Sequence, residues 1–176
     1  LGHNSLGSNT SGHSNTASGY QSLQSNTTGY YNTAVGGYTL SSNTTGLYNT
    51  GSGYQSLNYN TTGSQNTAAG YRSLLFNDDG NANTSMGYNS LFYNTAGSSN
   101  TALGNSSLYN NTTASYNTAV GMSALENNTQ GNNNTALGYH SGDVITTGSN
   151  NVMLGYGSDP SANTGSNQIV VGYGAT

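Results

Sequence analysis

Apolar side chains recur along this chain once every seventeen residues with polar residues between them, a period unlike that of an amphipathic helix. The leucine column contains Leu6, Leu23, Leu40, Leu57, Leu74, Leu91, Leu108 and Leu125. A glycine column keeps the same interval without a break from Gly2 to Gly172. A fixed period without insertions is the sequence signature of a solenoid or repeat array. We therefore interpret residues 1–176 as one repeat array and expect it to be a segment of a longer fibre protein.

Two asparagine columns share this period, one before each predicted strand and one in the turn N-T-T-G. Asparagine is a good turn residue, and identical amides stacked coil over coil can form hydrogen-bonded ladders. We therefore predict a structural role for both columns. The column before the strand contains Asn15, Asn32, Asn49, Asn66, Asn83, Asn100, Asn117 and Asn134, and the turn column contains Asn9, Asn26, Asn43, Asn60, Asn77, Asn94, Asn111 and Asn128.

The repeat is too short for a helix pair, and Asn, Gly, Ser and Thr all disfavour helix. The sequence instead predicts an all-β fold, a parallel β-solenoid of about ten coils stacked at roughly 4.8 Å. Each coil is expected to hold two short strands joined by two turns. The resulting rod would be about 50 Å long at that spacing.

Alternation within the first strand suggests which side chains face the core. Residues two apart share a face of a strand, so we expect Thr33 and Val35 to point inward and Ala34 to point outward. An outward alanine column would allow a neighbouring chain to approach closely. The leucine at Leu23 then requires a reversal of face, which we assign to a tight turn or bulge with positive φ at Gly19 and its equivalents.

Composition narrows the classes of function. The chain has a single cation, Arg72, no lysine and a net charge of −4, which excludes a nucleic-acid binder. No apolar run is long enough for a membrane span. Cysteine is absent, so a disulfide framework is excluded. With only 31% apolar residues each coil has a thin core, and this favours association of several copies as a homo-oligomer or filament.

Catalytic and metal-binding patterns are absent from the sequence. Asp78 and Asp79 could contribute to a calcium site in the turn N-D-D-G, but two acids without further ligands favour a solvated turn. The histidines His3, His13 and His140 occupy different columns without partners at metal spacing. No serine stands with His and Asp in a nucleophile arrangement. We therefore predict no catalytic residue, no metal, no cofactor and no enzymatic activity.

A tyrosine column follows the glycine column and includes Tyr20, Tyr54, Tyr71, Tyr88 and Tyr139. Tyrosine combines an apolar ring with a polar tip and is common at interfaces. The column therefore predicts either a contact between chains or a stripe that recognises carbohydrate or matrix ligands.

The turn asparagines also form sequons at Asn9, Asn26, Asn43, Asn60 and Asn111, which are possible glycan attachment sites. The alternative is that N-T-T is simply favourable turn chemistry. Asparagine persists in this column at Asn77 and Asn94, where the sequon is broken, and this favours the structural interpretation.

The string N-T-A-x-G-Y-x-S-L, with residues 151–158 (N-V-M-L-G-Y-G-S) and 168–175 (Q-I-V-V-G-Y-G-A), resembles the repeats of YadA-like trimeric autotransporter adhesin heads. It also resembles repeat regions of bacteriophage tail fibres and of large bacterial surface proteins that end in a self-cleaving chaperone domain. The resemblance covers essentially the whole chain. It implies a left-handed parallel β-roll, three chains side by side, and an extended fibre. The seventeen-residue period is longer than the repeat of those heads, and the extra residues fall in the N-T-T-G turn.

These observations predict a structural extracellular fibre segment, on a cell surface or virion, that serves display and adhesion. One alternative is a glycosylated filament subunit or a module that binds carbohydrate or a host-surface ligand. Another is an ice-binding solenoid, because Thr27, Thr44, Thr61 and Thr112 could form a regular rank, although Asp78 interrupts it.

Overall fold

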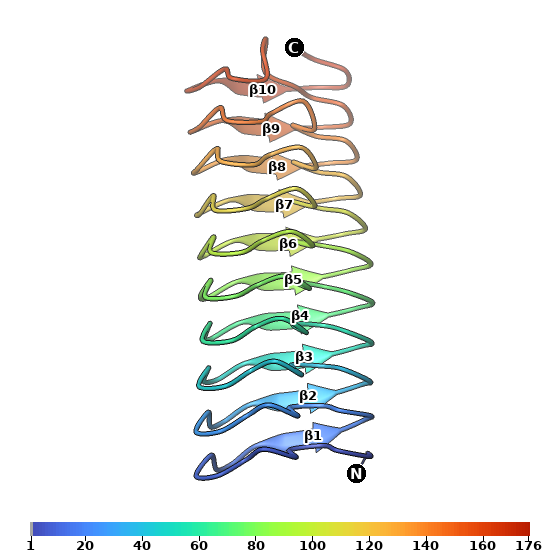
Figure 1. Ribbon diagram of the computed structural model, residues 1–176. Coiled ribbons are helices and arrows are strands. Elements are labelled where there is room, and N and C mark those ends of the chain that lie inside the picture. The colour runs from blue at the N-terminus through green and yellow to red at the C-terminus, as the bar shows by residue number, and fades with distance from the viewer. Residues whose placement is uncertain (1) are drawn as a thin grey trace.

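A computed structural model describes residues 2–176 as a stack of coils that form a straight rod (Figure 1). Each coil contributes one strand, and the ten strands form a single parallel sheet in chain order, with no helix in residues 2–176. The register is one repeat, so that Thr33 lies opposite Thr50 and Ala68 opposite Ser85. The all-β parallel solenoid with a seventeen-residue period is confirmed. The strands are β1 (Thr16–Ser18), β2 (Thr33–Val35), β3 (Thr50–Ser52), β4 (Thr67–Ala69), β5 (Thr84–Met86), β6 (Thr101–Leu103), β7 (Thr118–Val120), β8 (Thr135–Leu137), β9 (Val152–Leu154) and β10 (Ile169–Val171).

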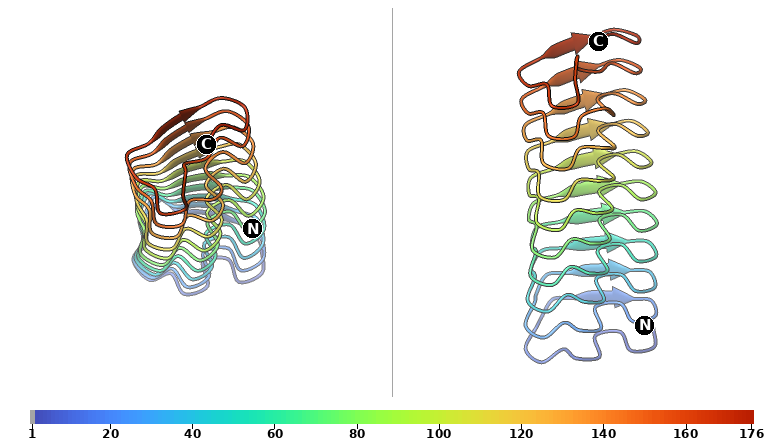
Figure 2. Two further views of the ribbon diagram at one scale, coloured as in Figure 1. Left: turned by 90° about the horizontal axis from the view of Figure 1, so that it is seen from above. Right: turned by 45° about the horizontal axis from the view of Figure 1, so that its top comes forward.

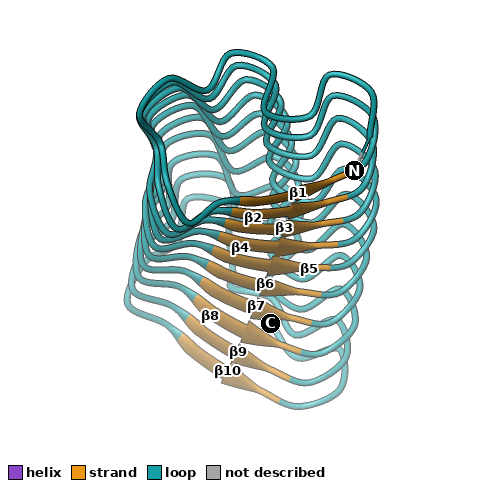
Figure 3. Cartoon of the chain, turned by 90° about the horizontal axis from the view of Figure 1, so that it is seen from below, coloured by secondary structure: helices purple, strands orange, loops and turns teal. Residues whose placement is uncertain are grey.

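The prediction of two strands in each coil is wrong. Strands form one wall of the rod, and loops and turns form the rest of each coil (Figures 2 and 3). In the segment after the glycine, Gln55 and Leu57 have φ of 58° and 52°. These left-handed positions are incompatible with a pleated strand. The loop wall still stacks through backbone hydrogen bonds, for example from Leu57 N to Ser73 O at 3.1 Å.

The predicted orientation of the strand side chains is also wrong. Ala34 and Ala102 point inward and are fully buried, whereas Val35 and Leu137 point outward and are 45% and 50% exposed. The reason is the narrow gap between the sheet and the loop wall. The leucine column of the loop wall, fully buried from Leu23 to Leu125, fills that gap and leaves room only for a small residue on the strand.

Compensating side chains show how tightly this core is packed. At β3 the alanine is replaced by Gly51, and a Cβ added there would lie 2.5 Å from the Thr39 methyl. Near the C-terminal end of the rod, Gly142 takes the place of the column leucine, and Met153 takes the place of the strand alanine. The Met153 methyl fills the space left by the leucine and would lie 2.6 Å from a Cβ added at Gly142. The volume of each layer is therefore conserved even where the repeat sequence changes.

The glycines that follow each strand adopt the conformation expected of them. From Gly19 to Gly172 this column has φ between 128° and 143°. The prediction of a turn that requires positive φ is confirmed.

Candidate functional site

The turn asparagines form a continuous amide ladder inside the rod. Asn43 Nδ2 donates to Asn26 Oδ1 at 2.9 Å and to Gly46 O, in its own turn, at 3.1 Å. The same pair of bonds recurs in each coil up to Asn128, and every ladder residue from Asn26 onward is fully buried. This ladder is confirmed. It ends where Ile145 occupies the next asparagine position.

The asparagines before the strands form a second ladder of a different kind. Asn49 N donates to Asn32 Oδ1 at 2.9 Å, and Asn49 Nδ2 donates to Gly63 O at 2.8 Å. The amide thus joins the strand entry of one coil to a turn carbonyl fourteen residues later. The same pattern holds for the predicted column from Asn15 to Asn134, so its structural role is also confirmed.

Burial of the turn ladder bears directly on glycan attachment. A glycan would be joined to the side-chain nitrogen of the sequon. At Asn26, Asn43, Asn60 and Asn111 that nitrogen is buried and donates two hydrogen bonds. These four sequons are therefore inaccessible in the folded chain, and only Asn9, in the first coil, is partly exposed.

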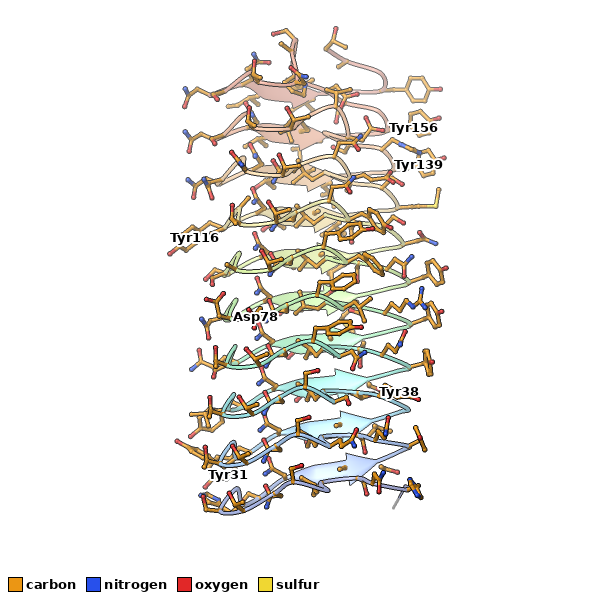
Figure 4. All side chains as sticks on the ribbon, in the orientation of Figure 1. Tyr31, Tyr38, Asp78, Tyr116, Tyr139 and Tyr156 are labelled. Atoms are coloured by element: carbon orange, nitrogen blue, oxygen red, sulfur yellow. The ribbon has the colours of Figure 1, made fainter. Side chains whose placement is uncertain are left out.

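The predicted tyrosine column forms an exposed edge of the rod, visible at Tyr139 and Tyr156 in Figure 4. Tyr71 stacks between Tyr54 and Tyr88, with ring centroids 5.7 and 5.2 Å away. The Arg72 guanidinium lies 5.0 Å from the Tyr71 ring centroid. Tyr20 and Tyr139 lie on the same edge, 47% and 40% exposed. The structure thus stacks three members of the predicted stripe, whereas Asn105 and Met122 separate them from Tyr139 along the same edge. Ligand binding along the stripe stays a prediction.

The threonine rank that suggested an ice-binding face lies in the turns. Thr27 Oγ1 donates to Thr44 O at 3.0 Å, and Thr44 and Thr112 make the equivalent bond to the following coil. These hydroxyls therefore tie coils together. Asp78 takes the threonine position in one coil, where its carboxylate accepts a hydrogen bond from the Thr61 hydroxyl.

A second aromatic cluster lies on the loop wall, and the sequence reasoning missed it. Phe76 stacks on Tyr59 and on Tyr93, with centroid separations of 5.1 and 5.6 Å and nearly parallel rings. Phe92 and Tyr109 form an adjacent stacked pair at 5.1 Å. The rings occur in only four successive coils, so no column extends along the whole chain. The signal in the sequence is an aromatic residue at one or both of the two positions before the turn asparagine in each of these four coils.

Beside this cluster the loop wall is hollowed into an open groove of about 510 Å³. One side is the threonine rank of four successive coils. We call this depression the wall groove; it is lined by Tyr93, Asn110, Asn127 and Val144 and by Thr95, Thr112, Thr129 and Thr146.

Among residues 2–176 no group of three or more His, Cys, Asp or Glu side chains could hold a metal ion. Asp78 and Asp79 are both exposed in their turn. Two titratable groups form an ion pair, His140 Nδ1 and Asp143 Oδ2, which lie 2.5 Å apart.

Asp159 lies near this pair, and its pKa is raised above the usual value of 3.8. Partial burial is the main cause, and the charge of Asp143 adds to it, against the opposing effect of backbone N–H groups of residues 142–144.

Asp159→Asn is expected to raise the free energy of unfolding at about pH 7, with the difference from the unchanged chain vanishing below about pH 3. A raised carboxyl pKa means that the folded state binds the proton more tightly. Its stability therefore falls as pH rises from 3.8 through the folded-state pKa. Urea unfolding across this pH range measures the effect. Asp79→Asn removes the same charge from an exposed turn, and an equal gain in both variants would contradict the role of burial.

In the described part of the chain, no helix has the length and apolarity needed to cross a membrane. Comparison with known proteins found no family model, no curated protein and no solved structure that matches this chain.

Proposed function

We propose that this chain is a rigid segment of an extracellular fibre in which copies pack side by side through the outer face of the sheet. The observation that carries this proposal is the exposed apolar column on that face. The column occupies seven of the ten strands and is unbroken from β5 to β10; it contains the exposed Val35, Met86, Leu137 and Val171 and the half-buried Leu103, Val120 and Leu154.

The geometry of this face suits a flat, extended contact. Successive strands are in register, so the apolar side chains follow one another along the rod with an outward threonine rank beside them. Met86 and Val171 are 48% and 64% exposed. Contiguous apolar surface of this extent is typical of a protein interface. Since each coil has a thin core of its own, burial of this column would add stability that the isolated chain lacks.

The remaining features support a mechanical role. Both asparagine ladders and the parallel sheet link every coil to the next along the axis. Such a stack extends in one dimension and resists bending more than a chain of flexible linkers would. The resemblance to trimeric adhesin heads suggests three copies and a place on a cell surface or virion.

Leu103→Asp combined with Leu137→Asp is expected to convert the assembly to single chains. Both side chains point away from the core, so charge on them should disfavour association while the coil remains folded. Native mass spectrometry should give about three times the 18.0 kDa chain mass for the unchanged protein and the single-chain mass for the variant.

Tyr116→Asp is the matched control, because Tyr116 is 66% exposed on the edge of the turns and should leave the assembly intact. A single-chain mass for the unchanged protein at micromolar concentration would contradict the proposal. So would an assembly that survives the double substitution.

A further inference from the structure

An aromatic ring, that of Tyr93, forms one end of the wall groove. Tyr93 uses one ring face to stack on Phe76, with centroids 5.6 Å apart and an interplanar angle of 3°. In the next coil Asn110 occupies the equivalent position and is not aromatic. Tyr93 lines the groove and is 42% exposed, so part of its ring is accessible there, while Tyr109 contacts the ring in a T-shaped arrangement with centroids 5.3 Å apart.

The residues that line the groove carry hydrogen-bonding groups without charge, set in a surface that is mostly apolar carbon. Asn110 Nδ2 donates to Asn127 Oδ1 at 3.3 Å, and Asn127 Nδ2 donates to Asp143 O at 2.8 Å. Each amide can still offer its second N–H hydrogen to a ligand. Thr112 and Thr129 donate their hydroxyl hydrogens to the following coil at 3.0 Å, which leaves oxygen lone pairs available as acceptors.

The backbone along the groove cannot take an extended peptide as an added strand. Thr112 N donates to Thr129 O and Thr129 N to Thr146 O, at 3.2 and 2.8 Å. These main-chain groups are thus already paired along the axis. Recognition in the groove depends on side-chain amides, hydroxyls and one ring face, and not on the main-chain pairing by which peptides join a sheet edge.

Charge also narrows the class of ligand. Glu126 and Asp143 lie directly beside the groove residues in the sequence, and the one cation of the chain, Arg72, lies on the tyrosine edge. An anionic ligand would therefore meet two carboxylates and no lysine or arginine near the groove, and the one nearby imidazole, His140, is paired with Asp143. A ligand with many hydroxyl groups and an apolar ring face matches the Tyr93 ring, the amides and the threonines.

We propose that the wall groove binds a short neutral glycan, with a pyranose ring packed on the exposed part of the Tyr93 ring and its hydroxyl groups bonded to Asn110 and Asn127. The volume of about 510 Å³ is in the range of small-molecule sites. The groove extends over three coil steps, or about 14 Å at roughly 4.8 Å per step, which suits an oligosaccharide rather than one sugar. This site goes beyond a role as a fibre shaft and does not depend on it.

The test uses cellotriose, maltotriose, chitotriose and mannotriose as probes, with trigalacturonic acid as the anionic comparison. Titration calorimetry and saturation-transfer NMR on the full chain are expected to show binding of at least one neutral trisaccharide, with Kd near or below about 1 mM. Tyr93→Ala should weaken that binding at least tenfold. Asn127→Trp should abolish the binding, because the indole would fill the groove. The fold should tolerate it, since Phe76 and Tyr93 hold the equivalent position in earlier coils.

Tyr71→Ala is the matched control, since it removes a stacked and exposed tyrosine from the other edge and should leave the affinity unchanged. Circular dichroism establishes that each variant keeps the fold. Binding lost in Tyr71→Ala but retained in Tyr93→Ala would place the glycan on the tyrosine edge and overturn the proposal. Absence of binding for all four neutral trisaccharides at about 10 mM, or preferential binding of trigalacturonic acid, would overturn it as well.

Discussion

Gly87→Ala is expected to lower the free energy of unfolding of the rod by at least about 3 kcal/mol, although it adds only one methyl group. Gly87 has φ of 142°, a conformation that side-chain-bearing residues rarely adopt. An added Cβ would lie 2.4 Å from Gly104 O and 2.7 Å from Gly104 C in the next coil. Gly104 cannot move away easily, because its N–H donates to Met86 O at 2.8 Å. The two coils would have to separate, and the stack would be interrupted at that point.

Urea unfolding followed by far-ultraviolet circular dichroism measures this cost. Gly37→Ala is the first control, since its added Cβ would make an ordinary contact of 3.4 Å with the Tyr54 ring. Gly157→Ala is the second, because φ is 53° but no atom lies within 4 Å, so only the backbone strain of about 1–2 kcal/mol remains. If Gly87→Ala unfolded at the same urea concentration as Gly37→Ala, the close approach of the coils would not be essential.

The period itself determined most of what could be predicted. A column of glycine required a special backbone conformation at Gly19 and its equivalents, and the structure has positive φ there. Two columns of asparagine predicted stacked amides, and both ladders are present. These predictions succeeded because stacking repeats each local interaction, so a residue type kept in every coil reports one fixed environment.

The direction of the strand side chains could not be derived in the same way. In the tripeptide Thr33-Ala34-Val35, hydrophobicity alone favours valine in the core. The outcome depends instead on the width of the space inside the coil. That width is set by the buried leucine opposite, such as Leu40, whose position depends on left-handed backbone angles that sequence propensities argue against.

The loop wall shows why the second strand was predicted wrongly. Leu40 and Leu57 both have φ of 52°, although bulky residues rarely adopt the left-handed region. Backbone bonds to the next coil, such as Leu40 N to Ser56 O at 3.1 Å, compensate for this strain in every repeat. Tertiary stacking thus overrides local preference. The same irregular wall positions the rings and the groove, which is why the wall groove could not be anticipated from the sequence.

Asn94→Ala is expected to cost at least about 3 kcal/mol, although it removes only an uncharged side chain. Asn94 Nδ2 donates to Asn77 Oδ1 at 2.8 Å and to Gly97 O at 2.9 Å, and Asn94 Oδ1 accepts from Asn111 Nδ2 at 2.7 Å. The substitution leaves two buried groups unsatisfied, the oxygen of Asn77 and one N–H of Asn111. Each unsatisfied buried polar group costs about 1–3 kcal/mol. Urea unfolding gives the cost, and Asn105→Ala is the control, because this exposed amide bonds only the neighbouring Ser106 hydroxyl, at 2.8 Å.

The natural end of this ladder shows how the cost could be reduced. Beyond Asn128 the next position is Ile145, and Asn128 Oδ1 accepts a hydrogen bond from Gly131 N, in its own turn, at 3.1 Å. In Asn94→Ala, Asn77 could satisfy its oxygen in the same way with Gly80 N, and the Gly97 carbonyl would keep the bond from Asn83 Nδ2 at 2.8 Å. The buried Asn111 amide would keep its bond to Ala114 O but lose the acceptor of its other N–H. The side-chain amide protons of Asn111 should therefore exchange faster with solvent in the variant, as measured by NMR. Unchanged exchange together with unchanged stability would mean that the ladder follows from the stacking of the coils rather than stabilising it.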